Sequence, residues 1–213
     1  SVRRIISTLK ESDNVFLSEL IWREFFMQII YHFPKVVTEN FKAKYDGVIW
    51  RNNEEEFEKW CIGKTGYPLV DAGMRQLNAT GYMHNRVRMV TASFLCKHLL
   101  IDWRKGERWF FDTLLDGDFC SNNAGWQWVS GGGADAAPYF RIFNPILQGE
   151  KFDKDGDYVK RWVPELKNVP KKFIHKPWEL KNEKILRLGS DYPLPIVIHE
   201  KARLKALSAF KKV

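Results

Sequence analysis

Cysteine is scarce in this sequence, and long apolar runs are missing. The three cysteines, Cys61, Cys96 and Cys120, are odd in number, lie far apart and show no metal-ligand spacing. They exclude a disulfide framework of the secreted type, so we expect a reducing compartment and no metal site. No apolar run is long enough to cross a bilayer, and no signal peptide is evident. We therefore expect a soluble, cytoplasmic protein with no membrane partner.

Strand signals are equally scarce, because few stretches alternate apolar and polar positions. Neither internal repeats nor low-complexity tracts occur. Apolar residues recur instead at helical spacing, with Pro and Gly at the expected helix ends. Helices are predicted over residues 1–12, 17–33, 54–63, 68–81, 84–103, 106–117 and 199–213. The predicted fold class is all-α, as one domain over residues 1–213 with a long loop region at about 117–165.

An excess of one charge sign is absent from most of the chain. Acidic and basic residues balance over residues 1–166, so the net charge of +8 comes from a basic C-terminal extension, residues 167–213. Lysine-rich helical faces are usually just solvated, and both DNA contact and plain solubility remain open for this extension. Any nucleic-acid site in the rest of the chain must therefore be argued from particular residues.

The most unusual stretch is residues 116–133, DGDFCSNNAGWQWVSGGG, which combines two carboxylates, two asparagines, two tryptophans and three glycines in a row. Asp116 and Asp118 sit at the end of an amphipathic helix whose dipole disfavours negative charge there, so an arginine or the polar edge of a cofactor is needed to compensate. The asparagines offer donors and acceptors to a heterocycle, and the glycines allow a close backbone approach. The stretch predicts a pocket for a planar ligand; a flavin and a nucleobase both fit.

The first long predicted helix carries a second candidate group. Glu19, Trp22 and Arg23 lie at i, i+3 and i+4 and therefore share one face, beside an apolar stripe. A Glu–Arg pair at this spacing is more often a surface ion pair. The tryptophan between the two charges favours a recognition surface instead.

The central helix carries a third group. Asn85, Arg88 and Met89 share a face, while Arg86 points about a quarter turn away. A solvated helix face is the alternative interpretation. Two arginines on different faces can also serve two separate anionic surfaces, and the residues alone leave both interpretations open.

Several long motifs resemble the photolyase/cryptochrome family: SELIWREFF, KTGYPLVDAGMRQLNATGYMHNRVRM, LLIDWRKGERWF, DGDFCSNNAGWQWVSGGGADAAPYFRIFNP and QGEKFDKDGDYVKRWVPEL. The resemblance covers most of residues 17–170 and is to the helical FAD-binding domain of bacterial enzymes that repair cyclobutane pyrimidine dimers. It implies that FAD binds at the centre of the domain and that light drives an electron from reduced FAD into a dimer flipped out of the duplex. UV-damaged DNA is the implied partner, and we expect a monomer.

The resemblance also implies residue roles. Asn122 faces the flavin nitrogen that takes the proton on reduction, Arg88 pairs with Asp116, and Glu19 hydrogen-bonds the dimer. The implied cofactor-binding residues are Arg23, Asn85, Arg88, Asp116, Asp118 and Asn122. The implied DNA- and lesion-binding residues are Glu19, Trp22, Arg86, Met89, Trp128 and Arg141. Trp126, Trp103 and Trp50 match the chain that carries electrons to the flavin, and with Glu19 and Asn122 they form the implied catalytic set.

Subtype follows from the same positions. Asn122 is typical of photolyases, whereas many cryptochromes have Cys or Asp there, and Asn85 with Met89 fits repair of cyclobutane dimers. The aromatic residue before the MHNR motif is Tyr82, where the family has Trp. A cryptochrome-type photoreceptor is the alternative function, and a helical DNA-binding piece without a cofactor is a third. The family's antenna domain and phosphate-binding loop have no counterpart in the sequence, so we expect an N-terminally truncated domain.

Overall fold

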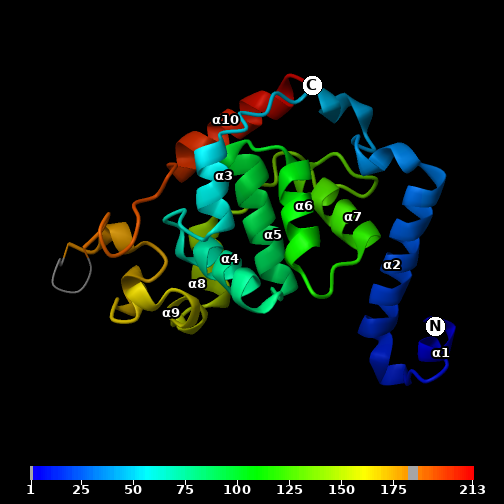
Figure 1. Cartoon of the computed structure of the whole chain (residues 1–213), viewed down its shortest axis with the longest axis horizontal. Coiled ribbons are helices and arrows are strands. Elements are labelled where there is room, and N and C mark those ends of the chain that lie inside the picture. Colours follow the sequence, from blue (N-terminus) through cyan, green and yellow to red (C-terminus); the bar gives the residue numbers. More distant parts are fainter. Residues whose placement is uncertain (1, 182–186) are drawn as a thin grey trace.

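The computed structural model describes residues 2–181 and 187–213, and Figure 1 shows a helical molecule. Within these residues the one strand-like feature is an isolated bridge between Leu188 and Tyr192. The all-α prediction is therefore confirmed. In the same described part of the chain, no helix has the length and apolar character needed to span a membrane.

Ten α-helices occur in the described residues. They are α1 (Val2–Ile6), α2 (Asn14–His32), α3 (Glu54–Cys61), α4 (Pro68–Thr80), α5 (Asn85–Ser93), α6 (Trp103–Thr113), α7 (Phe119–Ser130), α8 (Pro145–Phe152), α9 (Asp157–Trp162) and α10 (His199–Lys211). A π-helical segment, Phe94–Leu99, continues α5. Short 3₁₀ turns lie at Glu11–Asp13, Pro34–Val37, Ala43–Gly47, Pro164–Leu166, Lys171–Phe173 and Pro177–Glu179.

Helices with strong local end signals lie where they were predicted. The side chain of Asn53 caps α3 by accepting a hydrogen bond of 2.9 Å from the amide of Glu56. Helix α4 begins at Pro68 and ends before Gly81, which has a left-handed φ of 66° that favours glycine.

The prediction of one helix over residues 84–103 is wrong. The helical path ends after the π-helical segment, where Leu100 adopts a left-handed φ of 51°. A new helix, α6, starts at Trp103, and the side chain of Asp102 caps it by accepting from the amide of Arg104 at 3.0 Å. Glycine usually marks such a left-handed residue, so the sequence carried no sign of this break.

The prediction of a long loop over about 117–165 is also wrong, because α7, α8 and α9 lie there. Asn, Ser and Gly are poor helix formers, so the residues of α7 did not predict a helix. The side chain of Asp118 caps α7 by accepting a hydrogen bond of 2.9 Å from the amide of Ser121. Helix α7 also packs against α2, α5 and α6.

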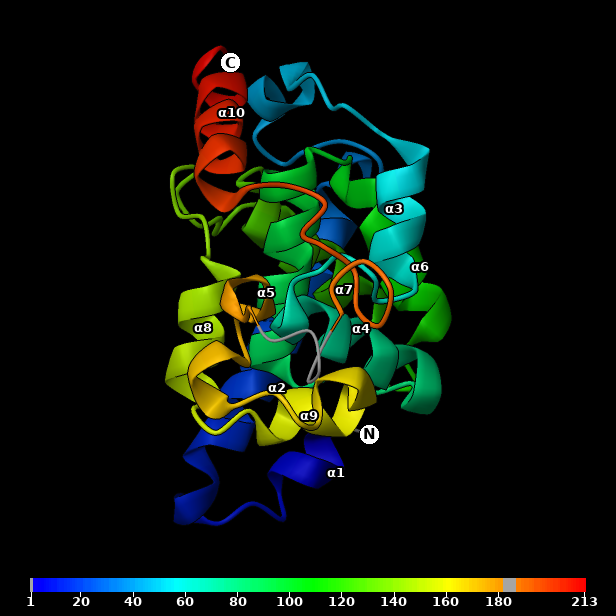
Figure 2. The ribbon, with the colours of Figure 1, turned by 90° about the vertical axis from the view of Figure 1, so that its left-hand side faces the viewer.

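Helices α5, α6 and α7 lie side by side at the centre, with α2 along one side of the molecule next to α7 (Figure 1). Helices α8 and α9 pack against α4, and α10 lies against the π-helical segment at one end (Figure 2). The largest core cluster is built mainly from α3 to α7. Its fully buried large side chains include Trp60, Met74, Leu77, Phe94, Leu95 and Trp103.

The C-terminal segment packs back onto the start of α4. The hydroxyl of Tyr192 donates to Asp71 at 2.5 Å, and the amide of Ile196 donates to the carbonyl of Thr65 at 3.0 Å. The hydroxyl of Tyr67 donates to the carbonyl of Val197 at 2.8 Å. Part of the basic extension is thereby anchored to the helical core.

Candidate functional site

A cavity of about 540 Å³ lies between α2, α5, α7 and the segment that joins α6 to α7. This volume is within the range of small-molecule and cofactor sites. Nine of the residues singled out in the sequence line it: Glu19, Asn85, Arg88, Met89, Asp116, Asp118, Asn122, Trp126 and Trp128. Three separate stretches of sequence thus converge on one cavity.

The polar rim begins with Arg88 and Asp116. The guanidinium donates two hydrogen bonds to the carboxylate, at 2.8 and 3.0 Å, and a third to the carbonyl of Met83 at 2.6 Å. The predicted pairing of Arg88 with Asp116 is confirmed. Arg88 thus compensates the negative charge of Asp116, which lies just after α6. The ion pair also holds the segment between α6 and α7 on α5, so both charges are fixed at the mouth of the cavity.

Asp118 has a different environment from the one predicted. It lies at the N-terminus of α7, where the helix dipole favours a carboxylate, instead of opposing the dipole of α6. Burial opposes ionisation, but hydrogen bonds from Ser121 and the ion pair with Arg23, at 3.1 Å, outweigh it and lower the pKa of Asp118. Asp118 is therefore an ionised acceptor at neutral pH that also ties α2 to α7.

Asn122 is oriented by a residue that the sequence analysis missed. Its Nδ2 donates to the carbonyl of Glu107 at 2.9 Å and to the carboxylate of the same residue at 3.1 Å. Burial raises the pKa of Glu107, and the hydrogen bond from Asn122 opposes that rise. Because both contacts use the amide donor, the carbonyl Oδ1 of Asn122 remains available as an acceptor toward the cavity. No short-range pattern could have linked residues 107 and 122.

Aromatic side chains form the floor of the cavity. Trp126 is 2% exposed and meets the ring of Phe110 edge-on at 5.0 Å. Its indole also packs on Gly106, where an added Cβ would lie 2.1 Å from the ring. Trp103 begins α6 one turn before Gly106, so Trp126 lies on the same face of α6 as Trp103.

Replacing Gly106 by alanine is expected to lower the free energy of unfolding by about 1 kcal/mol or more, although alanine is the better helix former. The new methyl group would meet Trp126 and the Cδ2 of Leu95, at 2.1 and 2.5 Å. Gly125→Ala is the matched control, because a Cβ there has no neighbour within 4 Å and should stabilise α7 slightly. Urea unfolding measures both variants, and equal stabilities would contradict the close approach of Trp126 to α6.

Six predicted residues lie outside the cavity lining: Trp22, Arg23, Trp50, Arg86, Trp103 and Arg141, of which Arg23 pairs with Asp118 at its edge. Trp22 is 41% exposed and stacks at 5.6 Å on Phe26, and Phe26 lines the cavity in its place. The guanidinium of Arg86 lies 4.9 Å from the ring centre of Phe152 on α8. Arg141 is exposed on the segment after α7, and Trp50 is half-buried beside Phe210 of α10 at 5.8 Å.

Comparison with known proteins gives the family. Residues 16–212 match the model of the FAD binding domain of DNA photolyase. The chain belongs to this family. It is 58% identical over 202 residues to deoxyribodipyrimidine photo-lyase of Agrobacterium fabrum, and 54% identical over 199 residues to the enzyme of that name from Escherichia coli. The matches cover 93% of this chain, and it spans 42% of the length of each of these relatives.

Solved structures agree with this photolyase FAD-binding fold. A class III photolyase from Agrobacterium tumefaciens superposes with a TM-score of 0.91 at 56% identity, over 98% of this chain and 44% of the other. A cryptochrome from Synechocystis superposes with a TM-score of 0.88 at 39% identity, over the same shares. The family and fold implied by the sequence motifs are therefore confirmed.

Proposed function

We propose that this domain is the catalytic part of a deoxyribodipyrimidine photo-lyase, which splits cyclobutane pyrimidine dimers in UV-damaged DNA with light and reduced FAD. The observation that carries the proposal is the arrangement of the cavity. On the α7 side, the cavity is lined by the amide of Asn122 and by the carboxylates of Asp116 and Asp118. On the α2 side, the same cavity is lined by the carboxylate of Glu19. One cavity thus has suitable groups for a flavin and for a pyrimidine dimer.

The cavity residues fit the flavin ring. Asn122 Oδ1 can accept a hydrogen bond from a protonated ring nitrogen, and Asp118 can accept one from the pyrimidine-like edge. Arg88 and Asp116 supply a fixed ion pair nearby. Arg23 supports Asp118, and Asn85 adds a further amide to the lining. When bound, reduced FAD supplies the electron that opens the cyclobutane ring. The side chains named here bind and orient the ring and exclude water from it.

The lesion side is formed by different residues. Glu19 hydrogen-bonds the dimer and stabilises it while it carries the extra electron, and Met89 and Trp128 form apolar walls that accept the flipped bases. Trp22, Arg86 and Arg141 lie outside the lining, and in this proposal they contact the DNA around the lesion. The two arginines act on the phosphate backbone, so their contribution falls as salt rises.

Electrons reach the flavin through Trp126, Trp103 and Trp50 in this proposal. The burial of the three side chains is compatible with this order, because Trp126 and Trp103 are buried and only Trp50, the outermost, is partly exposed. The buried Nε1 atoms of Trp126 and Trp103 have no hydrogen-bond partner among the described residues. An oxidised inner indole therefore has no adjacent base to take its proton, which favours return of the electron or its onward transfer.

Glu19→Gln tests the function. Glutamine keeps the size of the side chain but replaces the carboxyl group that hydrogen-bonds the dimer, so the yield of dimer splitting should fall about tenfold, equivalent to ~1.4 kcal/mol, with a smaller loss of lesion binding. The measurement is repair of irradiated oligothymidylate by the chain with added, photoreduced FAD. Glu24→Gln is the control, because Glu24 is on α2 and does not line the cavity. An unchanged yield in Glu19→Gln would remove Glu19 from the mechanism; wild-type chain that binds FAD but repairs nothing would argue against the function.

A monomeric state and a cytoplasmic location stay predictions. An antenna chromophore also stays a prediction, and it concerns the part of the relatives that this chain does not span.

A further inference from the structure

Helix α2 carries Glu19, yet its own apolar packing holds it only weakly. None of its residues is buried, and Ile21, Trp22 and Phe25 are 61%, 41% and 37% exposed. Figure 1 shows α2 along one side of the molecule, beside α7. Polar contacts must therefore contribute to fixing its position relative to the cavity.

One such contact is exposed. Arg23 pairs with Asp118 at 3.1 Å, and the two side chains are 46% and 29% exposed. Surface pairs of this kind are screened by salt and stabilise by at most about 1 kcal/mol. This pair lies midway along α2, so it does not act directly on the C-terminal end of the helix.

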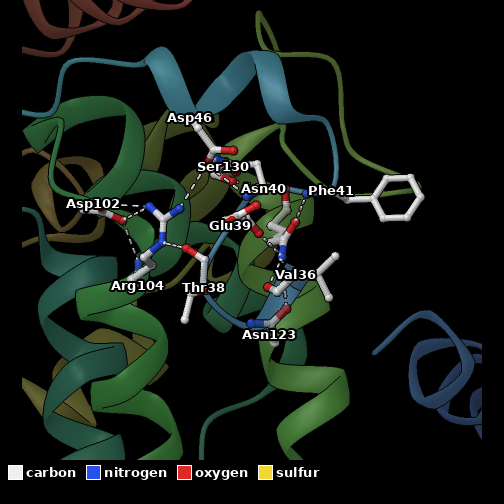
Figure 3. Close-up of polar contacts among 11 residues, drawn as sticks. Val36, Thr38, Glu39, Asn40, Phe41, Asp46, Asp102, Arg104, Asn123 and Ser130 are labelled. Atoms are coloured by element: carbon white, nitrogen blue, oxygen red, sulfur yellow. Dashed lines mark hydrogen bonds and ion pairs between the residues drawn. The ribbon is translucent and has the colours of Figure 1, made fainter. Parts of the chain in front are cut away.

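The second contact is buried and centres on Gln127, which is 2% exposed. Its Oε1 accepts from the amide of Phe41 at 2.9 Å. Its Nε2 donates to the carbonyl of Val36 at 2.8 Å, to the carbonyl of Glu39 at 3.3 Å and to Oδ1 of Asn123 at 3.1 Å. The polar groups of this cluster converge from two segments far apart in the sequence (Figure 3).

The segment held in this way follows α2 directly. Helix α2 ends at His32, and the amide of Val36 donates to the carbonyl of Phe33 at 3.0 Å, so residues 36–41 continue from the helix without slack. Fixing residues 36–41 on α7 therefore fixes the C-terminal end of α2.

The same contacts bear on the wall of the cavity. A small second cavity of about 40 Å³ lies behind Trp128, and Val36, Phe41 and Gln127 are among its lining residues. Trp128 is thus backed by the segment that Gln127 holds. Gln127 itself lies between Trp126 and Trp128 in the chain and points away from the main cavity, whose lining it does not join.

We propose that Gln127 is a positioning residue for lesion recognition. By holding residues 36–41 on α7 it sets the separation of α2 from α7, and so the place of Glu19 opposite Asn122 and Trp128. The inference rests on the proposed function, because this separation affects recognition only if the cavity receives a pyrimidine dimer.

Gln127→Leu removes the contacts at similar volume, and Gln76→Leu is its matched control. Gln76 lies on α4, outside the cavity, and its side chain also accepts a partly buried hydrogen bond, from the hydroxyl of Tyr158 at 2.6 Å. Both variants lose a glutamine hydrogen bond. Only Gln127→Leu should reduce the preference for irradiated over unirradiated oligothymidylate, by about tenfold, because only it removes the buried contacts between residues 36–41 and Gln127 of α7.

Two further readouts separate positioning from a general loss of stability. Hydrogen exchange should accelerate at residues 33–41 in Gln127→Leu and not in α4, whereas a global loss of stability accelerates both. Gln127→Glu should recover lesion preference as the pH falls, because a protonated carboxyl can again donate to the carbonyl of Val36 and burial raises its pKa.

The outcomes are distinguishable. Tenfold loss of lesion preference in Gln127→Leu, with normal preference in Gln76→Leu and faster exchange at residues 33–41, supports the inference. Wild-type preference retained in Gln127→Leu overturns it while leaving the proposed function intact. A wild-type chain with no preference for irradiated DNA overturns the proposed function, and this inference with it.

Discussion

Replacing Asp71 by alanine is expected to lower the free energy of unfolding by about 3–5 kcal/mol, the largest loss we predict for a single side chain. The carboxylate is fully buried and accepts four hydrogen bonds. They come from the amide and hydroxyl of Thr65 at 2.7 and 2.6 Å, the amide of Gly66 at 3.0 Å and the hydroxyl of Tyr192 at 2.5 Å. Alanine would leave these donors buried without an acceptor.

Urea unfolding measures this loss, and Tyr192→Phe calibrates it. That variant removes one donor and keeps the carboxylate with its three remaining bonds, so about 1 kcal/mol is expected. An Asp71→Ala chain that is no less stable than Tyr192→Phe would contradict the view that Asp71 joins the start of α4 to the C-terminal segment. Asp71 does not line the cavity, so the folded fraction of either variant should bind FAD as the wild type does.

The fold could be predicted where the signal is local. The acidic first turn of α3 follows an asparagine cap, and α4 begins at Pro68 and ends just before Gly81. The ends of these helices are therefore determined by a few adjacent residues. The break at Leu100 and the whole of α7 could not be predicted in this way. Leu100 adopts a left-handed conformation that its side chain disfavours, and α7 depends on neighbouring helices to compensate for Asn, Ser and Gly.

The residues of the site also divide into those with a local sequence signal and those that only the packing brings together. The residues alone indicated that Asp116 needs a positively charged partner, and the resemblance to the family correctly named Arg88 as that partner. Glu107 and Gln127 could not be found from their surroundings in the sequence. Each acts on a residue or segment brought near only by the packing of α6, α7 and the segment after α2. Side chains that orient others are therefore recognised mainly from the structure.

Acidification is expected to destabilise the chain through His98, a residue of the π-helical segment. Its ring is 3% exposed, stacks on Phe94 at 4.8 Å, and its Nε2 lies 2.8 Å from Nδ1 of His199, the first residue of α10. Burial, with a smaller contribution from His199, lowers the pKa of His98 from 6.5 to about 3. The folded chain therefore keeps His98 neutral at a pH where the unfolded chain binds a proton.

The sign of the effect follows from this difference. The stability contributed by neutral His98 is fully present above about pH 6.5 and is lost as the pH falls from there toward about pH 3. From about pH 6.5 to about pH 5 the loss should reach about 1.5 kcal/mol. Lys97 affects stability at higher pH. Burial lowers its pKa from 10.5 to about 7, so the stability contributed by neutral Lys97 is lost as the pH falls from about 10.5 to about 7.

Urea unfolding at several pH values isolates the effect by comparison with His98→Gln. That variant should be less stable than the wild type near neutral pH, and its stability should fall less steeply with acid, by one proton. Val163→Ala, a buried change in a separate core cluster, should lower stability equally at every pH. If His98→Gln and the wild type show the same pH slope, His98 is not held neutral, and the contact between the π-helical segment and α10 tolerates its charge.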